Sequence, residues 1–357
     1  MRVYAFLTAL AATRAYHSPM SRRMVRATAT PSPQPLSSIV KQAAFECQRN
    51  IHTFRFSGYF IFYLPPLADV AGAYDQNTAI DSVFLSAAAY CNASAINAWS
   101  CGACNRISLR SVKAIEYPGY NLQAYVGQRS NGVLCVGVAD WIFRRLVLAR
   151  DGWWRLFMHV TGEIVVGFRG TQPSSLKNWI EDLKSAEHVA YPFSGCSGCR
   201  TAKGFTESYA ALRGDILNHL DALGGKSHPV TVTGHSLGAA MAGVCAFDLK
   251  QQGFTVNPVY TFGQPRVGDS TFFNAFQQSF PSGSYFRVTH YKDIVPHLPF
   301  TIMSYHHMST EVWYAEDNLS YRVCNGSGED PSCSDSVFGD SISDHLHYVG
   351  YPISNMC

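Results

Sequence analysis

The hydrophobic positions of residues 203–290 follow two different periods. Across residues 203–223 they recur at helical spacing, which predicts an amphipathic helix with one apolar face. The apolar positions of this helix are Phe205, Tyr209, Leu212, Ile216, Leu217, Leu220 and Leu223. Short β-branched and aromatic runs at residues 230–233, 258–263 and 284–290 predict buried strands, and the apolar segments between them predict two further helices. Strands that alternate with helices in this way argue for an α/β layered fold.

Two segments on the N-terminal side of this region extend the pattern. Residues 154–159 and 163–168 are strand-like runs, and the Thr161-Gly162 pair between them predicts a hairpin. Residues 81–90 predict a helix with several consecutive apolar positions. We expect the core of the α/β fold to begin near that helix.

Residues 234–238, Gly-His-Ser-Leu-Gly, fit the pattern G-x-S-x-G between a predicted strand and a predicted helix. Both glycines have a physical reason, because a side chain on either flank of so sharp a turn would collide with the crossing backbone. The turn presents the Ser236 hydroxyl near the first amides of the helix, which favour developing negative charge. The alternative is a Gly-Ser turn without chemistry, but the flanking strand and helix favour a nucleophile.

A serine nucleophile needs a base, and the base needs an acid that orients it. In α/β-hydrolases the acid and then the histidine follow the serine along the chain. Asp269 and Asp293 are the acid candidates, and we favour Asp293 because it directly follows a predicted strand, whereas capping of a helix explains Asp269. His345 is the favoured base, since the base usually lies on a loop near the C-terminus. The other histidine candidates are His290, His297, His306, His307 and His347.

Residues 174–183 predict a short amphipathic helix that follows the strand at residues 163–168. Ser174 or Ser175 is placed to cap its first turn. Its apolar stripe consists of Leu176, Trp179, Ile180 and Leu183. The segment is either a helix packed permanently on the core or a hinged lid that covers Ser236 and offers the stripe to a lipid surface when it opens.

Composition limits the kind of partner and the location of the protein. The chain has 357 residues, 47% of them hydrophobic, which suffices for a large core, and its net charge of +3 is too weak to indicate a nucleic-acid partner. Residues 3–12 form an apolar run after Arg2, which predicts a signal peptide over residues 1–15, with a buried first helix as the alternative. No later segment has the apolar length of a bilayer span, so we expect no transmembrane anchor.

Cysteine usage supports export. The sequence has 11 cysteines, and the two C-x-x-C pairs at residues 101–104 and 196–199 lie too far apart to suggest one zinc site. Disulfides formed in an oxidising compartment explain them better, and N-x-S sequons at Asn92, Asn318 and Asn325 fit a secreted glycoprotein. We expect secretion, with the lumen of the endomembrane system as the alternative. Residues 16–75 differ in composition from the rest and are either a pro-segment or an N-terminal extension before a hydrolase domain over residues 76–357.

A series of short motifs runs through the chain from about Asp81 to Cys357. They are residues 87–91 (AAAYC), 99–104 (WSCGAC), 165–171 (VVGFRGT), 178–183 (NWIEDL), 204–205 (GF), 234–239 (GHSLGA), 260–268 (YTFGQPRVG), 290–296 (HYKDIVP), 305–311 (YHHMSTE) and 344–346 (DHL). Each is weak alone, but together and in this order they resemble the class 3 lipases, a family of secreted filamentous-fungal triacylglycerol lipases.

The resemblance implies an α/β-hydrolase fold with a central, mostly parallel sheet, helices on both faces and a short helical lid. It also implies a triad in which Ser236 is the nucleophile, Asp293 the acid and His345 the base. By the same resemblance, the backbone amides of Thr171 and Leu237 form the oxyanion hole.

The resemblance further implies three disulfides. They are Cys91–Cys357, Cys101–Cys104 and Cys324–Cys333. Spacing alone suggests a local bridge between Cys196 and Cys199. Cys47, Cys135 and Cys245 are then left over, and Cys245 is expected to be a buried thiol because it lies on the apolar helix after the serine.

We therefore expect a secreted serine hydrolase that cleaves carboxylic esters of acylglycerols at a lipid–water interface through an acyl-enzyme. The triad chemistry needs no metal or organic cofactor, and we expect a monomer. One alternative is a feruloyl-type esterase or a phospholipase on the same fold, and another is a catalytically inactive lipid-binding homologue. The loop at residues 171–175 looks longer than in the compact fungal enzymes, which bears on the geometry of the lid and not on the triad.

Overall fold

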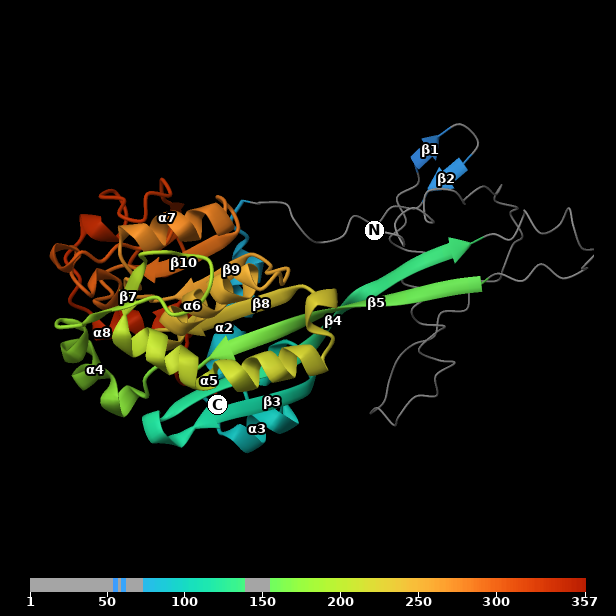
Figure 1. Ribbon diagram of the computed structural model, residues 1–357, viewed down its shortest axis with the longest axis horizontal. Helices are drawn as coiled ribbons and strands as arrows, with labels where there is room; N and C mark the ends of the chain where they lie inside the picture. The colour runs from blue at the N-terminus through green and yellow to red at the C-terminus, as the bar shows by residue number, and fades with distance from the viewer. Residues whose placement is uncertain (1–53, 57–58, 62–72, 139–154) are drawn as a thin grey trace, which may run out of the picture. The chain divides into compact units, whose positions relative to one another are not determined.

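The computed structural model describes the backbone of residues 54–56, 59–61, 73–138 and 155–357 (Figure 1). The expected signal peptide and nearly all of the expected pro-segment or extension lie outside these residues, so both stay predictions. Cys47 and the side chain of Cys135 also lie outside the described part.

The chain divides into two compact units. The larger comprises residues 67–130 and 162–357, and the second comprises residues 1–66 and 131–161. The described part of the second unit contains β1 (Phe54–Phe56), which pairs antiparallel with β2 (Tyr59–Ile61). Residues 131–161 belong to the hydrolase domain predicted from the sequence but group with the second unit. The long strands β4 (Leu122–Val138) and β5 (Arg155–Phe168) contribute residues to both units.

An eight-stranded sheet lies at the centre of the α/β fold (Figure 1). Its strands in spatial order are β12 (Tyr321–Val323), β11 (Glu311–Tyr314), β10 (Tyr285–His290), β9 (Val259–Phe262), β8 (Val230–His235), β5 (Arg155–Phe168), β4 (Leu122–Val138) and β3 (Leu109–Tyr117). The strands from β5 to β11 pair in parallel, whereas β3 pairs antiparallel with β4 and β12 antiparallel with β11. The expected mostly parallel sheet is confirmed.

One predicted turn is wrong. Residues 155–168 form the single strand β5, and the hairpin expected at Thr161-Gly162 does not form. Gly162 has a packing reason instead, because a Cβ there would lie 2.6 Å from Nε2 of Gln128. A glycine between two strand-like runs marks a close side-chain crossing here, and not a turn.

The alternation of side chains along β5 separates two hydrophobic clusters. Ile164, Val166 and Phe168 pack into one cluster, whereas Val165 packs into the other. The first cluster includes side chains from α4 (Leu176–Leu183), α5 (Lys203–Ala222), α6 (Leu237–Gln251) and α7 (Ser270–Ser279). The second includes side chains from α2 (Gln76–Ala88) and α3 (Ala93–Ala98). Helices therefore cover both faces of the sheet, as the sequence predicts.

Two short antiparallel pairs complete the described strands outside the main sheet. β6 (His188–Ala190) pairs with β7 (Arg200–Ala202), and β13 (His347–Tyr348) pairs with β14 (Tyr351–Pro352). Among the helices of the described residues, none combines the length and the apolar character needed to cross a bilayer.

Four disulfides are present in the described part of the chain. They are Cys91–Cys357, Cys101–Cys104, Cys196–Cys199 and Cys324–Cys333. Cys91–Cys357 links residues 266 positions apart and so ties the segment after α2 to the region that follows β14. Cys245 is a buried free thiol on α6, and burial raises its pKa.

Replacing Cys324 and Cys333 together by serine is expected to lower the free energy of unfolding by about 2–3 kcal/mol. The bridge closes a loop between residues nine positions apart, and its loss enlarges the conformational freedom of the unfolded chain. Urea unfolding of both proteins under non-reducing conditions measures the difference. Equal free energies of unfolding would show that this bridge does not stabilise the fold.

Candidate active site

Ser236 lies in the turn between β8 and α6, at the carboxyl end of its strand. Its backbone angles, φ 61° and ψ −127°, fall in a region that L-residues rarely occupy, so the turn is strained. Gly234 and Gly238 permit the turn, because a Cβ on Gly234 would collide with the carbonyl of Gly238 and a Cβ on Gly238 would collide with the carbonyl of Phe168. Strand, strained turn and helix together have the geometry of a nucleophile elbow.

Asp293 and His345 are brought together by two loops. Asp293 follows β10, and His345 is the last residue of α8 (Ile342–His345). Nδ1 of His345 lies 2.9 Å from Oδ2 of Asp293, and both side chains are buried. A backbone bridge between Asp293 and Ser341 holds the two loops side by side. A carboxylate in this position fixes the imidazole tautomer, so that Nε2 is left free to accept a proton.

Two further groups hold the Asp293 carboxylate. The backbone N–H of Val295 donates to Oδ1 at 2.8 Å, and the hydroxyl of Tyr348 donates to Oδ2, the same oxygen that faces His345. Burial raises the pKa of Tyr348, so its hydroxyl stays protonated and remains a donor. Tyr348 was not predicted from the sequence as a site residue. Its position three residues after the favoured base is the signal that could have indicated it.

Among the buried polar atoms of the described residues that lack a hydrogen-bond partner are Oγ of Ser236, Nε2 of His345 and Oγ1 of Thr171. Ser236 and His345 are each 0% exposed, so protein covers both side chains. A buried polar atom without a partner costs about 1–3 kcal/mol, and such atoms in a native protein call for an explanation such as catalysis. These atoms are suited to pairing with a bound substrate.

A pocket of about 270 Å³ lies beside the elbow. Thr171 and Leu237, the residues expected to form the oxyanion hole, both line it, and α4 contributes Asn178 and Trp179. The loop that carries Thr171 packs directly on the elbow, because a Cβ added to Gly170 would lie 3.0 Å from Cβ of Ser236. Residues of the expected oxyanion hole and of the expected lid therefore line this pocket, and Ser236 directly precedes the lining residue Leu237.

Helix α4 has one buried face and one exposed face. Leu176, Ile180 and Leu183 are buried in the core, and Trp179 is half-buried with its ring centroid 6.5 Å from that of Phe205. The exposed face carries Lys177, Asn178, Glu181 and Asp182. Ser175 occupies the N-cap position, as expected, but its side chain makes no capping hydrogen bond, and a 3₁₀ turn leads into the helix.

The other acid and histidine candidates have different partners. The Asp269 carboxylate accepts a hydrogen bond from the first turn of α7, the capping role that the sequence indicates. His307 is buried, with Nε2 2.7 Å from a backbone carbonyl, and burial lowers its pKa well below the usual value. His290, His306 and His347 each have a ring nitrogen within 3.0 Å of a backbone carbonyl. His345 is the histidine whose ring nitrogen meets the Asp293 carboxylate.

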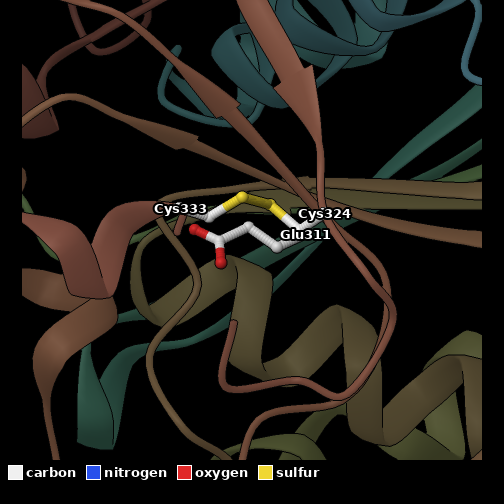
Figure 2. Close-up of side chains that lie close together, drawn as sticks. All are labelled: Glu311, Cys324 and Cys333. Atoms are coloured by element: carbon white, nitrogen blue, oxygen red, sulfur yellow. A yellow bond between two sulfur atoms is a disulfide. The ribbon is translucent and has the colours of Figure 1, made fainter. Parts of the chain in front are cut away.

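Glu311, Cys324 and Cys333 form a buried cluster whose ligand-type atoms lie within 4.8 Å of one another (Figure 2). The two sulfur atoms are joined in a disulfide and so are not thiolates that could bind a metal (Figure 2). The Glu311 carboxylate accepts a hydrogen bond from the Thr289 hydroxyl at 2.6 Å and one from the Ser334 amide at 3.3 Å. This cluster therefore supports the structure around β11 and does not fit a metal.

Comparison with known proteins adds sequence similarity to this geometry. Residues 165–303 match the family described as lipase (class 3). A lipase from Rhizomucor miehei is 38% identical over 198 residues, which cover 52% of this chain and 52% of that protein. Secreted mono- and diacylglycerol lipase A from Penicillium cyclopium is 35% identical over 162 residues, which cover 45% of this chain and 50% of that protein. The matching stretch thus spans about half the length of each of these relatives.

Similarity to solved structures extends further along the chain. A structure of Rhizomucor miehei triacylglyceride lipase is 30% identical with a TM-score of 0.62, covering 80% of this chain and 98% of that one. The structure of a fungal lipase–inhibitor complex is also 30% identical, with a TM-score of 0.60, and the match covers 79% of this chain and 97% of that one. Both carry the fold described above along nearly their whole length. The parallel sheet with its strained turn at Ser236, together with these similarities, establishes that this α/β-hydrolase chain belongs to the class 3 lipase family.

Proposed function

We propose that this protein is a serine hydrolase that cleaves the carboxylic ester bonds of acylglycerols, with Ser236, Asp293 and His345 as its triad. The observation that carries the proposal is the buried 2.9 Å contact between Asp293 and His345, on loops at the same edge of the sheet as the strained turn of Ser236. Hydrolysis of p-nitrophenyl butyrate by the purified protein is the first test. A folded protein without esterase activity would contradict the proposal and favour an inactive lipid-binding homologue.

The proposed mechanism follows from the roles of the three side chains. Nε2 of His345 takes the proton of the Ser236 hydroxyl as Oγ attacks the ester carbonyl carbon. Asp293 stabilises the resulting imidazolium, which then protonates the departing alcohol. Water activated by His345 attacks the acyl-enzyme, releases the fatty acid and restores the serine.

The oxyanion of each tetrahedral intermediate forms beside the N-terminus of α6. We assign its stabilisation to the backbone amides of Thr171 and Leu237, which both border the pocket next to the elbow. The unpaired hydroxyl of Thr171 is a further donor available to the same oxygen. Donors fixed before the reaction need no reorganisation when the charge develops.

The names of relatives support an acylglycerol as the substrate class. The similar proteins include one named a triacylglyceride lipase and one named a secreted mono- and diacylglycerol lipase. Rates on emulsified triacylglycerol, dissolved diacylglycerol, a phospholipid and a feruloyl ester separate the possibilities. We expect the highest kcat/KM on an acylglycerol, and a preference for the phospholipid or the feruloyl ester would overturn the substrate assignment while leaving the triad intact.

We further propose that the protein is secreted and acts as a monomer. A relative named as secreted, the four disulfides of the described chain and sequons at the exposed Asn92 and Asn325 support export. Mass spectrometry of protein from the medium of an expressing host should find glycan on at least one sequon. It should also find an N-terminus that lacks the signal peptide. Retention of the full chain inside the cell would contradict secretion.

We propose α4 as a lid, and Trp179→Ser tests it. The open form would place the apolar stripe of the helix on lipid, where burial of apolar area contributes about 25 cal/mol per Å². Trp179 is half-buried and lines the pocket, so it is placed both to cover the site and to enter a lipid surface. The variant is expected to lose about tenfold in rate on emulsified triolein and less than about twofold on dissolved tributyrin.

Lys177→Ser is the matched control for this experiment, because Lys177 lies on the exposed face of the same helix. It should change neither rate by more than about twofold. An equal loss on both substrates in the Trp179 variant would show that α4 is a fixed wall of the pocket. A wild-type rate that rises smoothly through the solubility limit of tributyrin would lead to the same conclusion.

A further inference from the structure

Two side chains outside the triad form a hydrogen-bonded chain that reaches the backbone of the proposed base. The hydroxyl of Tyr90, just after α2, lies 2.7 Å from Nδ1 of His235. Nε2 of His235 lies 2.7 Å from the backbone carbonyl oxygen of His345. The first of these hydrogen bonds joins residues 145 positions apart in the sequence, and the second joins residues 110 positions apart. His235 is the residue directly before the proposed nucleophile.

The backbone carbonyl of His345 determines which atoms carry the protons in these two hydrogen bonds. A carbonyl oxygen only accepts, so Nε2 of His235 carries the hydrogen and donates it to His345. In the neutral ring Nδ1 is then an acceptor, and the Tyr90 hydroxyl must donate to it. Burial raises the pKa of Tyr90, which keeps this donor protonated. Burial, with the neighbouring His345 as a second cause, lowers the pKa of His235 well below its usual value.

Tyr90 also contacts the loop that leads to Thr171. A Cβ on Gly170 would collide with the Tyr90 hydroxyl and lie 2.5 Å from the backbone carbonyl oxygen of His235. The charge of Arg169, and after it a hydrogen bond with the backbone of Gly170, oppose the rise in the pKa of Tyr90. The Tyr90 hydroxyl therefore contacts both His235, at the end of β8, and the loop of the proposed oxyanion hole.

The neutral state of His235 matters because its ring lies beside the ring of His345, the proposed base. The ring centroids of His235 and His345 are 4.5 Å apart, and the ring of Tyr348 lies 5.6 Å from that of His235. The titratable and charged groups around this ring are thus Tyr90, His345 and Tyr348, with Arg169 acting on Tyr90. A proton on His235 would place a second positive charge next to the imidazolium that His345 must form.

We propose that Tyr90 and His235 are positioning residues for ester hydrolysis. They tie the backbone of His345 to the loop of Thr171, and they present a neutral ring to the imidazolium of His345. This inference rests on the proposed triad, because it gives His235 a role only if His345 is protonated during the reaction. Neither residue lines the pocket beside the Ser236 turn, so the effect is expected on kcat and on the pH profile and not on substrate binding.

Tyr90→Phe removes the hydroxyl and keeps the ring. It is expected to lower kcat on p-nitrophenyl butyrate about tenfold, with KM within about twofold of wild type. Without its donor, Nδ1 of His235 takes up a proton more readily, so the acidic limb of kcat/KM moves to higher pH. Tyr125→Phe is the matched control, because it also removes a buried tyrosine hydroxyl, one that donates to the backbone carbonyl of Leu85 on α2 at 2.9 Å. That control should leave kcat and the pH profile unchanged.

The outcomes separate this inference from the proposed function. If Ser236→Ala is inactive but Tyr90→Phe behaves as Tyr125→Phe does, the triad stands and the positioning role is wrong. If Ser236→Ala is active, the triad itself is wrong.

A measurement on the wild-type protein covers the case in which Tyr90→Phe does not fold. Nitrogen NMR of ¹⁵N-histidine-labelled protein, with His235 assigned through the His235→Gln variant, should show a neutral ring protonated at Nε2 throughout the active pH range. A charged ring, or one protonated at Nδ1, would overturn the inference.

Discussion

Ser236→Ala is expected to lower kcat on a soluble ester by about a millionfold, to the level that binding and the oxyanion donors supply without a nucleophile. The loss is large because the proposed nucleophile is this hydroxyl. The turn holds it at the carboxyl end of β8 with no hydrogen-bond partner among the described residues. Alanine fits the site sterically, because it removes one buried oxygen and keeps Cβ. Burst and steady-state assays with p-nitrophenyl butyrate measure the loss.

The fold of this variant must be intact for the result to count. Because the removed hydroxyl is buried and unpaired, its loss should leave the thermal unfolding midpoint equal to or above that of the wild type. A stable Ser236→Ala protein with more than about one thousandth of wild-type turnover would mean that another residue is the nucleophile.

Asp293→Asn is expected to lower kcat by about ten-thousandfold. The carboxylate accepts from Nδ1 of His345, from the Tyr348 hydroxyl and from the Val295 amide. An amide in its place offers one oxygen and an NH₂ donor, so the imidazole ring is held in the wrong tautomer with a proton on Nε2. The base can then no longer take the serine proton. Single-turnover kinetics on the same soluble ester isolates this step from product release.

Asp269→Asn is the matched control for the acid. Asp269 precedes α7, and its carboxylate accepts a hydrogen bond from the Phe272 amide at 2.8 Å. Asparagine caps a helix about as well as aspartate, so both stability and turnover should stay close to wild type. A larger loss of activity in Asp269→Asn than in Asp293→Asn would show that the acid has been assigned to the wrong residue.

The elbow was the most predictable part of the site because its signals are local. A β-branched run, two glycines around a serine and a helix of small residues follow one another within residues 229–246. The strained backbone of Ser236 and the close packing at both glycines are the physical content of that pattern. No long-range information was needed to infer it.

The partners of the elbow depend on contacts that sequence order alone does not give. Asp293 was favoured because it directly follows a strand, but the backbone bridge from Asp293 to Ser341 is what brings the loop of His345 against it. Tyr348 hydrogen bonds to Asp293 across 55 positions of the sequence, and Tyr90 hydrogen bonds to His235 across 145. Such pairings follow from the order of strands in the sheet and from the packing of α2 against it, which one sequence does not reveal.

The hairpin expected at Thr161-Gly162 failed for a related reason. Glycine serves both turns and close side-chain crossings, and the two uses look alike until the neighbouring strand is placed. Gln128 on β4 is the neighbour that decides this case. The amphipathic stripe of α4, by contrast, was predictable from spacing, but spacing does not say whether the helix moves.

The most direct test of the central claim is covalent labelling with a p-nitrophenyl alkylphosphonate, which reacts with an activated serine and mimics the tetrahedral intermediate. Peptide mass spectrometry then locates the phosphonyl group while the esterase rate is followed in parallel. We predict one phosphonyl group per chain, on Ser236, with activity lost in proportion to labelling and no label in the Ser236→Ala variant. Complete inactivation with the phosphonyl group on any other residue would contradict the assignment of Ser236 as the nucleophile.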